Sequence, residues 1–324
     1  MSIYHTALIG TGYWGSIIFN TLCKITKKKI IIFDIDIKNS QQLKKKFKNQ
    51  AIIKKNIQEI LQNKNIKNLI LATHPSVNFQ LAKLALNNNK NIFIEKPIVT
   101  DPKKLSLLLK LSQKKNKILM GGYIYLYNPY IIKIKKILQN KLLGKIKYIE
   151  IERKNLGPIR NEVDAHVDLG SHDLSILKFL FSEKIKIKNI VKKEILKKNI
   201  SDISIINLKI KDIICQINSS WLNPTKERKL LIIGSKKMLL FDEMLSKNKL
   251  KIFDKYAYYP KITKFNADYI SNKARIYLGK TRNIKVYEKD VLKDELLDFI
   301  KSSENRIKPK ANGYFCLEVL KLLI

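Results

Sequence analysis

The hydrophobic residues in the first third of the chain form short apolar runs separated by amphipathic stretches. The runs are Ala7–Ile9, Ile30–Phe33, Leu69–Ala72, Ile92–Ile94 and Ile118–Met120. The stretches between them, such as 17–25, 77–86 and 102–111, have apolar residues at helical spacing. Strands that are apolar on both faces and alternate with helices are typical of a parallel sheet covered on both sides. We therefore predict a doubly wound parallel α/β domain over residues 1–121.

The pattern changes after residue 122. A helical stretch that begins at Pro129 is followed by segments in which apolar and polar residues alternate, at 205–210, 213–221, 229–233 and 238–242. Consecutive alternating strands without helices between them predict a mostly antiparallel sheet with one face against helices. Residues 122–324 are thus expected to form an α+β domain with an open sheet. Two helices, near 291–301 and 314–323, close the chain.

Composition is that of a folded globular protein. The chain has 324 residues, of which 45% are hydrophobic, enough for two domains with cores. No apolar run approaches the ~20 residues of a membrane span. The segment Met1–Gly10 lacks the features of a signal peptide. We expect a soluble cytoplasmic protein whose cysteines, Cys23, Cys215 and Cys316, are reduced, because no C-x-x-C pair is present.

The chain is strongly basic, with 64 Lys and Arg against 27 Asp and Glu, a formal net charge of +37. The lysines are spread over the whole length, and Gly and Pro are scarce, with 11 and 8 residues. This bias is typical of a genome rich in A and T, whose codons favour Lys. We therefore expect the charge to lie on solvated faces. We expect no specific nucleic-acid or membrane partner, although salt-sensitive adsorption to polyanions should occur.

A glycine-rich loop follows the first apolar run. The segment Gly10-Thr11-Gly12-Tyr13-Trp14-Gly15 is a full G-x-G-x-x-G that opens a helical stretch. Such glycines allow a tight turn, close approach of a pyrophosphate and close packing of helix on strand. Asp34 ends the second run, where an acid can bind ribose hydroxyls and would repel a 2′-phosphate. NAD is therefore expected rather than NADP. The alternative is an ordinary turn with a solvated aspartate.

Two further runs end in polar segments, Thr73-His74-Pro75 and Glu95-Lys96-Pro97. Ligands of open α/β sheets bind beyond the carboxyl ends of the strands, so both segments should border the nicotinamide end of a cofactor crevice. A partly desolvated lysine there is suited to proton transfer. The alternative for Lys96 is a rim lysine paired with Glu95.

A second polar motif, Asp168-Leu169-Gly170-Ser171-His172-Asp173, begins a helical pattern. Residues four apart lie on one face of a helix, so Asp168 could orient the imidazole of His172. The alternative is a capped helix start with a core histidine. His166 is expected to be structural or incidental, and a further polar contact is the alternative.

The order of these motifs, with Asn128-Pro129 between the last two, resembles the glucose-fructose oxidoreductase and inositol dehydrogenase family (Gfo/Idh/MocA) over nearly the whole chain. The resemblance implies an NAD(P)-binding Rossmann domain and an α+β domain whose open sheet builds homodimers or homotetramers. It implies hydride transfer between nicotinamide and a secondary hydroxyl carbon of a sugar or sugar nucleotide, such as a UDP-linked sugar for polysaccharide synthesis.

The resemblance also implies site residues. Lys96 and His172, with Asp168, would be catalytic, and which of the first two takes the proton stays open. The cofactor-binding residues would be Gly10, Thr11, Gly12, Tyr13, Trp14, Gly15, Asp34, Thr73, His74, Pro75, Glu95 and Lys96. The substrate-binding residues would be Lys96, Tyr123, Asn128, Arg153, Arg160, Asp168 and His172. The two arginines suit a diphosphate or a sugar carboxylate, and ordinary surface charge is the alternative. No metal site is expected.

Two positions depart from the family pattern, since Asn78 stands where many members have a histidine and Ser175 where many have an acid. Because of these two differences, the resemblance predicts the substrate less closely. A catalytically silent sensor of cofactor or sugar levels is the alternative to an enzyme. The presence of Lys96, Asp168 and His172 favours the enzyme, because a silent protein has no chemical need for all three.

Overall fold

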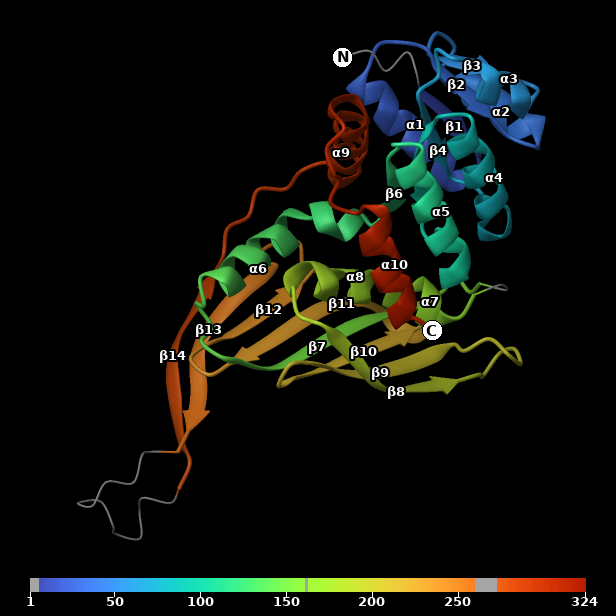
Figure 1. The fold of residues 1–324 in the computed structure, drawn as a ribbon. Coiled ribbons are helices and arrows are strands. Elements are labelled where there is room, and N and C mark those ends of the chain that lie inside the picture. Colours follow the sequence, from blue (N-terminus) through green and yellow to red (C-terminus); the bar gives the residue numbers. More distant parts are fainter. Residues whose placement is uncertain (1–5, 161–162, 260–272) are drawn as a thin grey trace. The chain divides into compact units, whose positions relative to one another are not determined.

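The computed structural model describes residues 6–160, 163–259 and 273–324, and the chain divides into two compact units (Figure 1). The first unit is formed by the chain up to Asn128 together with Lys289–Leu322. The second unit is formed by Pro129–Glu288. The sequence predicts a boundary at residue 121, with everything after it in the second domain. The two units therefore differ from that division mainly in where the C-terminal segment belongs.

The first unit contains a six-stranded sheet with the order β3-β2-β1-β4-β5-β6 in the described residues. Its strands are β1 (Thr6–Ile9), β2 (Ile30–Phe33), β3 (Ala51–Ile53), β4 (Asn68–Leu71), β5 (Asn91–Glu95) and β6 (Leu119–Gly122). All neighbouring strands pair in parallel. This confirms the predicted doubly wound sheet, and the strand order reverses between β1 and β4, where such folds bind ligands.

Helices connect these strands and bury both faces of the sheet. They are α1 (Tyr13–Ile25), α2 (Ile37–Lys46), α3 (Ile57–Gln62), α4 (Pro75–Asn87) and α5 (Pro102–Lys114). Leu8, Ile32, Ile70 and Phe93 are all fully buried, and each such side chain contributes about 1.5–3 kcal/mol. The short strand β3 was not predicted, because only Ala51 of its residues is buried.

The C-terminal segment returns to the first unit. Helix α9 (Val291–Asn305) packs on α1 and on the 3₁₀ turn η2 (Ile124–Tyr127), and α10 (Gly313–Leu322) packs on α5 and β6. The ring of Phe299 on α9 lies 5.8 Å from the ring of Phe93 on β5. The apolar stripe of α9 thus covers the sheet, which explains why these helices belong to this unit.

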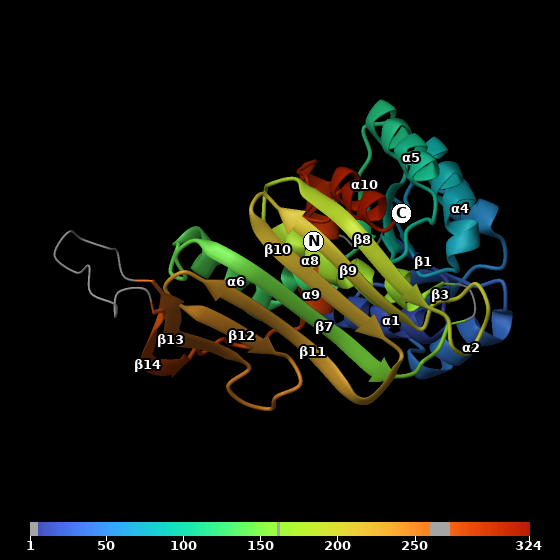
Figure 2. The same cartoon turned by 90° about the horizontal axis from the view of Figure 1, so that it is seen from below.

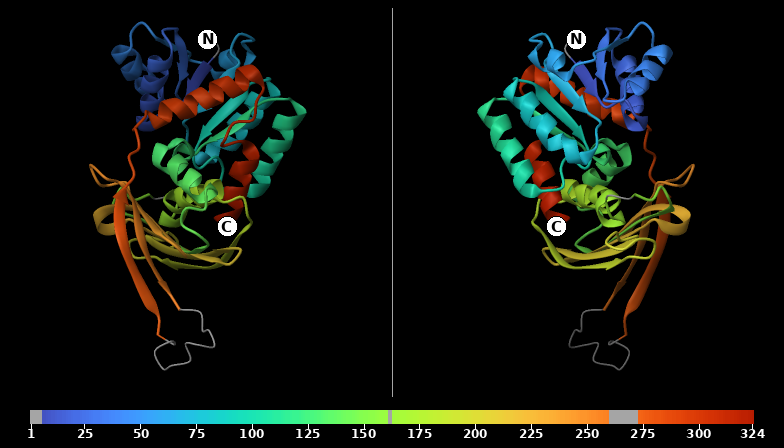
Figure 3. Two further views of the ribbon diagram at one scale, coloured as in Figure 1. Left: turned by 90° about the vertical axis from the view of Figure 1, so that its left-hand side faces the viewer. Right: turned by 90° about the vertical axis from the view of Figure 1, so that its right-hand side faces the viewer.

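The second unit contains an eight-stranded sheet, and Figure 2 shows the order β14-β13-β12-β11-β7-β10-β9-β8 among the described strands. They are β7 (Ile146–Leu156), β8 (Ile185–Lys193), β9 (Ile203–Ile210), β10 (Ile213–Ser220), β11 (Leu222–Gly234), β12 (Met238–Asp242), β13 (Leu250–Tyr258) and β14 (Arg275–Asn283). Only β7 and β10 pair in parallel within the described chain. The prediction of a mostly antiparallel sheet is confirmed. Strands β13 and β14 form a long ribbon at one end (Figure 3).

Three helices of this unit, α6 (Pro129–Gln139), α7 (Ala165–Asp168) and α8 (Gly170–Leu180), follow β6 and β7 in the chain. Helices α7 and α8 pack against the central strands, α7 on β9 and β10 and α8 on β7 and β10. Beneath them Trp221 is fully buried and clusters with Ala165 and Leu169. This cluster fixes the short helices that carry Asp168 and His172.

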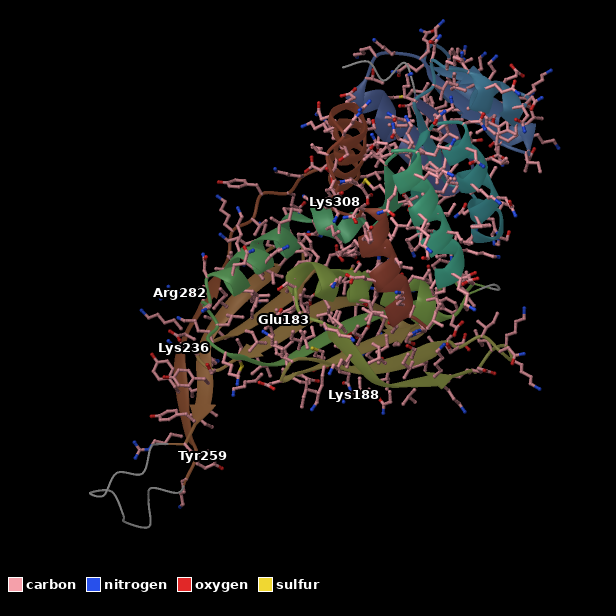
Figure 4. The ribbon with its side chains drawn as sticks, viewed as in Figure 1. Glu183, Lys188, Lys236, Tyr259, Arg282 and Lys308 are labelled. Carbon is pink, nitrogen blue, oxygen red and sulfur yellow. The ribbon has the colours of Figure 1, made fainter. Side chains whose placement is uncertain are left out.

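The positive charge lies mainly on exposed positions. Lys188 on β8, Lys236 between β11 and β12, and Arg282 on β14 are all exposed, and Figure 4 labels them on the second unit. Their charges are solvated, as the even spread of lysines along the sequence predicts. Within the residues that the structure describes, no helix is both long enough and apolar enough to cross a membrane.

Candidate active site

The glycine-rich loop between β1 and α1 is shaped by its first and third glycines. Gly10 has a φ of +89°, and a Cβ there would lie 2.5 Å from the carbonyl oxygen of Ala72. A Cβ on Gly15 would collide with the carbonyl oxygen of Gly10. A Cβ on Gly12, in contrast, would meet nothing within 4 Å. The loop is therefore closed by two obligatory glycines and leaves open space beside the backbone of Gly12, as a bound pyrophosphate requires.

The start of α1 also suits an anion. Gly12 is its N-cap, and in the described part of the chain no side chain caps it and no acid lies in its first turn. The backbone N–H groups of a helix N-terminus carry partial positive charge. These N–H groups are thus available to bind a phosphate group. The loop therefore fits a dinucleotide.

Asp34 is held against this loop. Its Oδ2 accepts hydrogen bonds from the Thr11 backbone N–H at 2.6 Å and from the Thr11 hydroxyl at 3.1 Å. Its Oδ1 accepts one from the Asp36 backbone N–H at 3.0 Å. These bonds fix a carboxylate at the carboxyl end of β2, beside the loop. A fixed carboxylate there can accept hydrogen bonds from ribose hydroxyls and disfavours a 2′-phosphate.

A polar bridge joins the ends of β4 and β5. The Thr73 hydroxyl donates to Asn78 Oδ1 at 2.6 Å, and Asn78 Nδ2 donates to the Pro97 carbonyl oxygen at 3.3 Å. Asn78 is almost fully buried. In the sequence Asn78 stands out only as a departure from a family pattern, whereas the structure shows that it ties Thr73 to the Glu-Lys-Pro segment.

His74 has a local structural role. It is the N-cap of α4, and its Nδ1 accepts a hydrogen bond from the Ser76 backbone N–H at 3.3 Å. Pro75 occupies the first turn of the helix, where its fixed φ is favourable. Both residues were predicted to bind a cofactor, and the structure shows that they define the start of α4 next to Thr73.

Glu95 and Lys96 follow β5. Glu95 Oε2 accepts a hydrogen bond from the Lys96 backbone N–H at 3.3 Å. Burial raises the pKa of Glu95 to about 7, opposed by a hydrogen bond from the Trp14 side chain and by the charge of Lys96. Trp14 belongs to the glycine-rich loop, so this contact links that loop to the Glu-Lys-Pro segment. The first unit thus gathers every predicted cofactor segment along the carboxyl ends of β1, β2, β4 and β5.

The second unit carries Asp168 and His172. Asp168 ends α7 and His172 lies in the first turn of α8, with Leu169 between the two helices. Both side chains are half-buried. Arg160 is about half exposed, and its Nε lies 3.8 Å from Asp168 Oδ2. The buried His166 contacts the Ser204 hydroxyl through Nδ1 at 3.3 Å, in keeping with a structural role.

Arg153 is committed to a buried ion pair. Its Nε donates to both oxygens of Asp173, at 2.8 and 3.0 Å, and its Nη2 lies 2.7 Å from Oδ1. The exposed fractions of the two side chains are 6% and 0%. The resemblance implies that Arg153 binds substrate. In the structure Arg153 fastens α8 to β7, which positions His172.

Two other predicted substrate-binding residues lie in the first unit and are mostly buried. Tyr123 packs edge-on against Phe315, with ring centres 5.7 Å apart, and Asn128 precedes α6. No group of His, Cys, Asp and Glu among the described residues has the arrangement of a metal site.

Comparison with known proteins identifies both units. Residues 4–123 match the model of an oxidoreductase family with an NAD-binding Rossmann fold, and residues 131–240 match the GFO/IDH/MocA C-terminal domain. The chain belongs to the Gfo/Idh/MocA oxidoreductase family. The Gfo/Idh/MocA fold thus accounts for the order of motifs that the sequence shows.

Curated relatives match parts of the chain. UDP-N-acetylglucosamine 3-dehydrogenase from Acidithiobacillus ferrooxidans is 28% identical over 109 residues, 33% of each chain. An uncharacterized oxidoreductase, YrbE, from Bacillus subtilis is 24% identical over 188 residues, 56% of this chain and 54% of that protein. The chain spans between 31% and 54% of the length of the curated relatives it matches.

Solved structures match over nearly the whole chain. The Acidithiobacillus ferrooxidans UDP-N-acetylglucosamine 3-dehydrogenase is 18% identical, covers 98% of this chain and 94% of its own, and has a TM-score of 0.78. GenD2 from gentamicin A biosynthesis, solved in complex with NAD, is 16% identical, covers 98% and 91%, and has a TM-score of 0.79. These likenesses show the fold.

The loop geometry predicts opposite effects for two glycine substitutions. Gly12→Ala should change the free energy of unfolding by less than about 0.5 kcal/mol, because a Cβ there meets open space, yet it should weaken dinucleotide binding. Gly15→Ala should destabilise the fold, because its Cβ collides with backbone. Calorimetric titration with NAD⁺ and urea unfolding check this pair. Unchanged NAD⁺ affinity in a folded Gly12→Ala protein would contradict the placement of the phosphates.

The buried ion pair predicts that the two arginines behave differently. Arg153→Met should cost about 3–5 kcal/mol of stability, because it leaves the Asp173 carboxylate buried without its partner. Arg160→Met is the matched control, and it should cost less than about 1 kcal/mol because the Arg160 guanidinium is about half exposed and lies 3.8 Å from Asp168. The measurement is urea unfolding of both variants. Equal midpoints would show that the Arg153–Asp173 pair does not hold α8.

Proposed function

We propose that this protein is an NAD-dependent dehydrogenase that acts on a secondary hydroxyl carbon of a sugar or sugar nucleotide. The observation that carries the proposal is the phosphate loop, with its open space at Gly12 and Asp34 bound to Thr11. Asp34 holds the loop through Thr11, and its carboxylate lies at the end of β2 beside the open space at Gly12. Both are accounted for by a bound dinucleotide without a 2′-phosphate.

The chain's own residues handle the proton. Oxidation of a carbinol removes a proton from its oxygen and a hydride from its carbon, and a bound nicotinamide supplies the hydride acceptor. Lys96 binds the reacting oxygen, and Lys96 Nζ or the imidazole of His172 receives the proton. Asp168 orients that imidazole. Asn78 and Glu95 hold the segment that presents Lys96, through the Pro97 carbonyl and the Lys96 N–H.

A sugar nucleotide is the substrate class that best fits the remaining residues. Arg160 is exposed beside Asp168, and a guanidinium is well suited to a diphosphate or a carboxylate. We leave Arg153 out of this set, because Asp173 occupies it. The relatives named above include a dehydrogenase of UDP-N-acetylglucosamine.

The protein is further proposed to act in the cytoplasm as a homodimer or homotetramer. Strands β13 and β14 expose Tyr258, Ile276 and Leu278. Neighbouring exposed apolar residues support an interface with another copy.

Replacement of Lys96 tests the proposed chemistry. Wild type should form NADH with one member of a panel of UDP-hexosamines, UDP-uronic acids, inositols and free sugars in moderate salt. Lys96→Met should keep NAD⁺ affinity and lose turnover by roughly 10²- to 10⁴-fold, because proton transfer is lost. Lys188→Met, on the exposed face of β8, is the matched control and should behave as wild type.

Other outcomes have definite meanings. Equal turnover in wild type and Lys96→Met would reject the role of Lys96. Saturable NADH binding without turnover of any panel member would favour the silent sensor.

A further inference from the structure

Glu295 is an acid in a core position. On α9 the buried residues are Leu292, Glu295, Leu296, Phe299, Ile300 and Ser302. The exposed fraction of Glu295 is 1%, and within the described chain neither carboxylate oxygen makes a hydrogen bond of normal geometry. The Tyr123 backbone N–H, the donor that acts on it, also donates to the Gly121 carbonyl oxygen at 3.0 Å. An ionised carboxylate in this position would be costly.

The next acid on the same helix shows the contrast. Asp298 is half-buried, and its Oδ2 accepts hydrogen bonds from the Tyr127 hydroxyl at 2.6 Å and from the Lys310 backbone N–H at 3.0 Å. Asp298 therefore has the donors that a carboxylate needs, whereas Glu295 is three residues away on the apolar face.

The alignment of α9 with β5 shows what Glu295 faces. Ser303 and Asn91 line one cavity, and Phe299 contacts Phe93 at 5.8 Å. Four residues along a helix advance about 6 Å, and two residues along a strand advance about 6.6 Å. The same antiparallel alignment therefore brings Glu295 toward Glu95, whose charge acts on it. Glu95 Oε1 is buried and has no hydrogen-bond partner among the described residues.

The backbone of β6 makes room for Glu95. Gly122 on β6 is the register partner of Glu95, and a Cβ on Gly122 would lie 2.7 Å from Glu95 Oε2 and 3.1 Å from Oε1. Any larger residue at this position would displace the carboxylate. Both oxygens of Glu95 thus lie against Gly122, and the next residue, Tyr123, supplies the backbone N–H that acts on Glu295.

Two facing carboxylates in a buried site cannot both be ionised at neutral pH. Burial and the charge of Glu95 raise the pKa of Glu295 well above its ordinary value. The pKa of Glu95 is raised to about 7, chiefly by burial. The other titratable groups around the pair are Lys96, Asp298, Tyr127, Tyr123 and Cys316. Burial raises the pKa values of both tyrosines and of the thiol, so they are neutral, and Lys96 is the cation beside the pair.

We propose that Glu295 is a positioning residue that stays protonated and donates its proton to Glu95 Oε1, so that the pair places a single negative charge beside Lys96. One proton then gives Glu95 Oε1 a donor and gives one of the two Glu295 oxygens a partner. The effect of this charge on Lys96 as a catalytic residue rests on the proposed function. The hydrogen bond between the two acids does not. The pair can be tested on the full chain without cofactor or substrate.

The first test is the pH dependence of unfolding. Folded Glu295 keeps its proton while the unfolded residue loses it above pH ~4.5, so wild type should lose stability relative to Glu295→Gln as pH rises. The ratio of the two unfolding constants should increase about tenfold per pH unit between pH 5 and 8. A ratio that is independent of pH would show that Glu295 is ionised in the folded protein and would overturn the proposal.

The second test reports on Glu95 through Trp14, whose side chain donates to it. Trp14 fluorescence should titrate near pH 7 in wild type and in Glu295→Gln, whose amide can still donate. In Glu295→Leu the midpoint should rise by about one unit, because a hydrogen bond to a charged group is lost. Glu95→Gln, as control, should abolish the titration, and Trp14→Phe identifies the signal.

An unshifted midpoint in Glu295→Leu would reject the link from Glu295 to Glu95. If only the sugar assay failed, the effect on Lys96 as a catalytic residue would be rejected and the acid pair would stand. The two failures are therefore distinguishable.

Discussion

The parallel arrangement of the six strands in the first unit is the constraint on which the candidate site depends. Parallel strands place all their carboxyl ends at one edge, and loops from distant parts of the sequence meet there. Runs of Ile, Leu and Phe with no polar alternation make these strands stable only when both faces are covered. Helices α1 to α5, together with α9 and α10, provide that cover. Burial of the sheet therefore also assembles its polar edge.

Polar side chains connect neighbouring loops along that edge. Asp34 binds Thr11, Asn78 joins Thr73 to Pro97, and Trp14 reaches Glu95. Each bond joins the end of one strand to the segment after another, so the loops hold one another in place. Such pre-organisation lowers the cost of ordering a site when its ligand binds. In the second unit the Arg153–Asp173 pair does the same for α8.

The sequence predicted those features that depend on periodicity and on local motifs. The parallel and the antiparallel sheet both follow from hydrophobic spacing, and the glycine-rich loop from its own residues. Features that depend on tertiary partners could not be predicted. Arg153 has the same sequence appearance as Arg160, and only the position of Asp173 separates a buried brace from an exposed cation. Helices α9 and α10 follow the second sheet in sequence but pack on the first. Glu295 is visible in the sequence as an acid that interrupts the apolar stripe of α9.

The central claim is that the edge formed by the glycine-rich loop and Asp34 binds NAD in preference to NADP. Titration of the wild-type chain with NADH and with NADPH, followed by quenching of Trp14 fluorescence, tests it directly. Trp14 lies in the first turn of α1, directly after Gly12 and Tyr13, whereas Trp221 is buried in the second unit and provides a constant background. The account predicts saturable quenching at lower concentrations of NADH than of NADPH. Absence of saturable quenching, or tighter binding of NADPH, would contradict it.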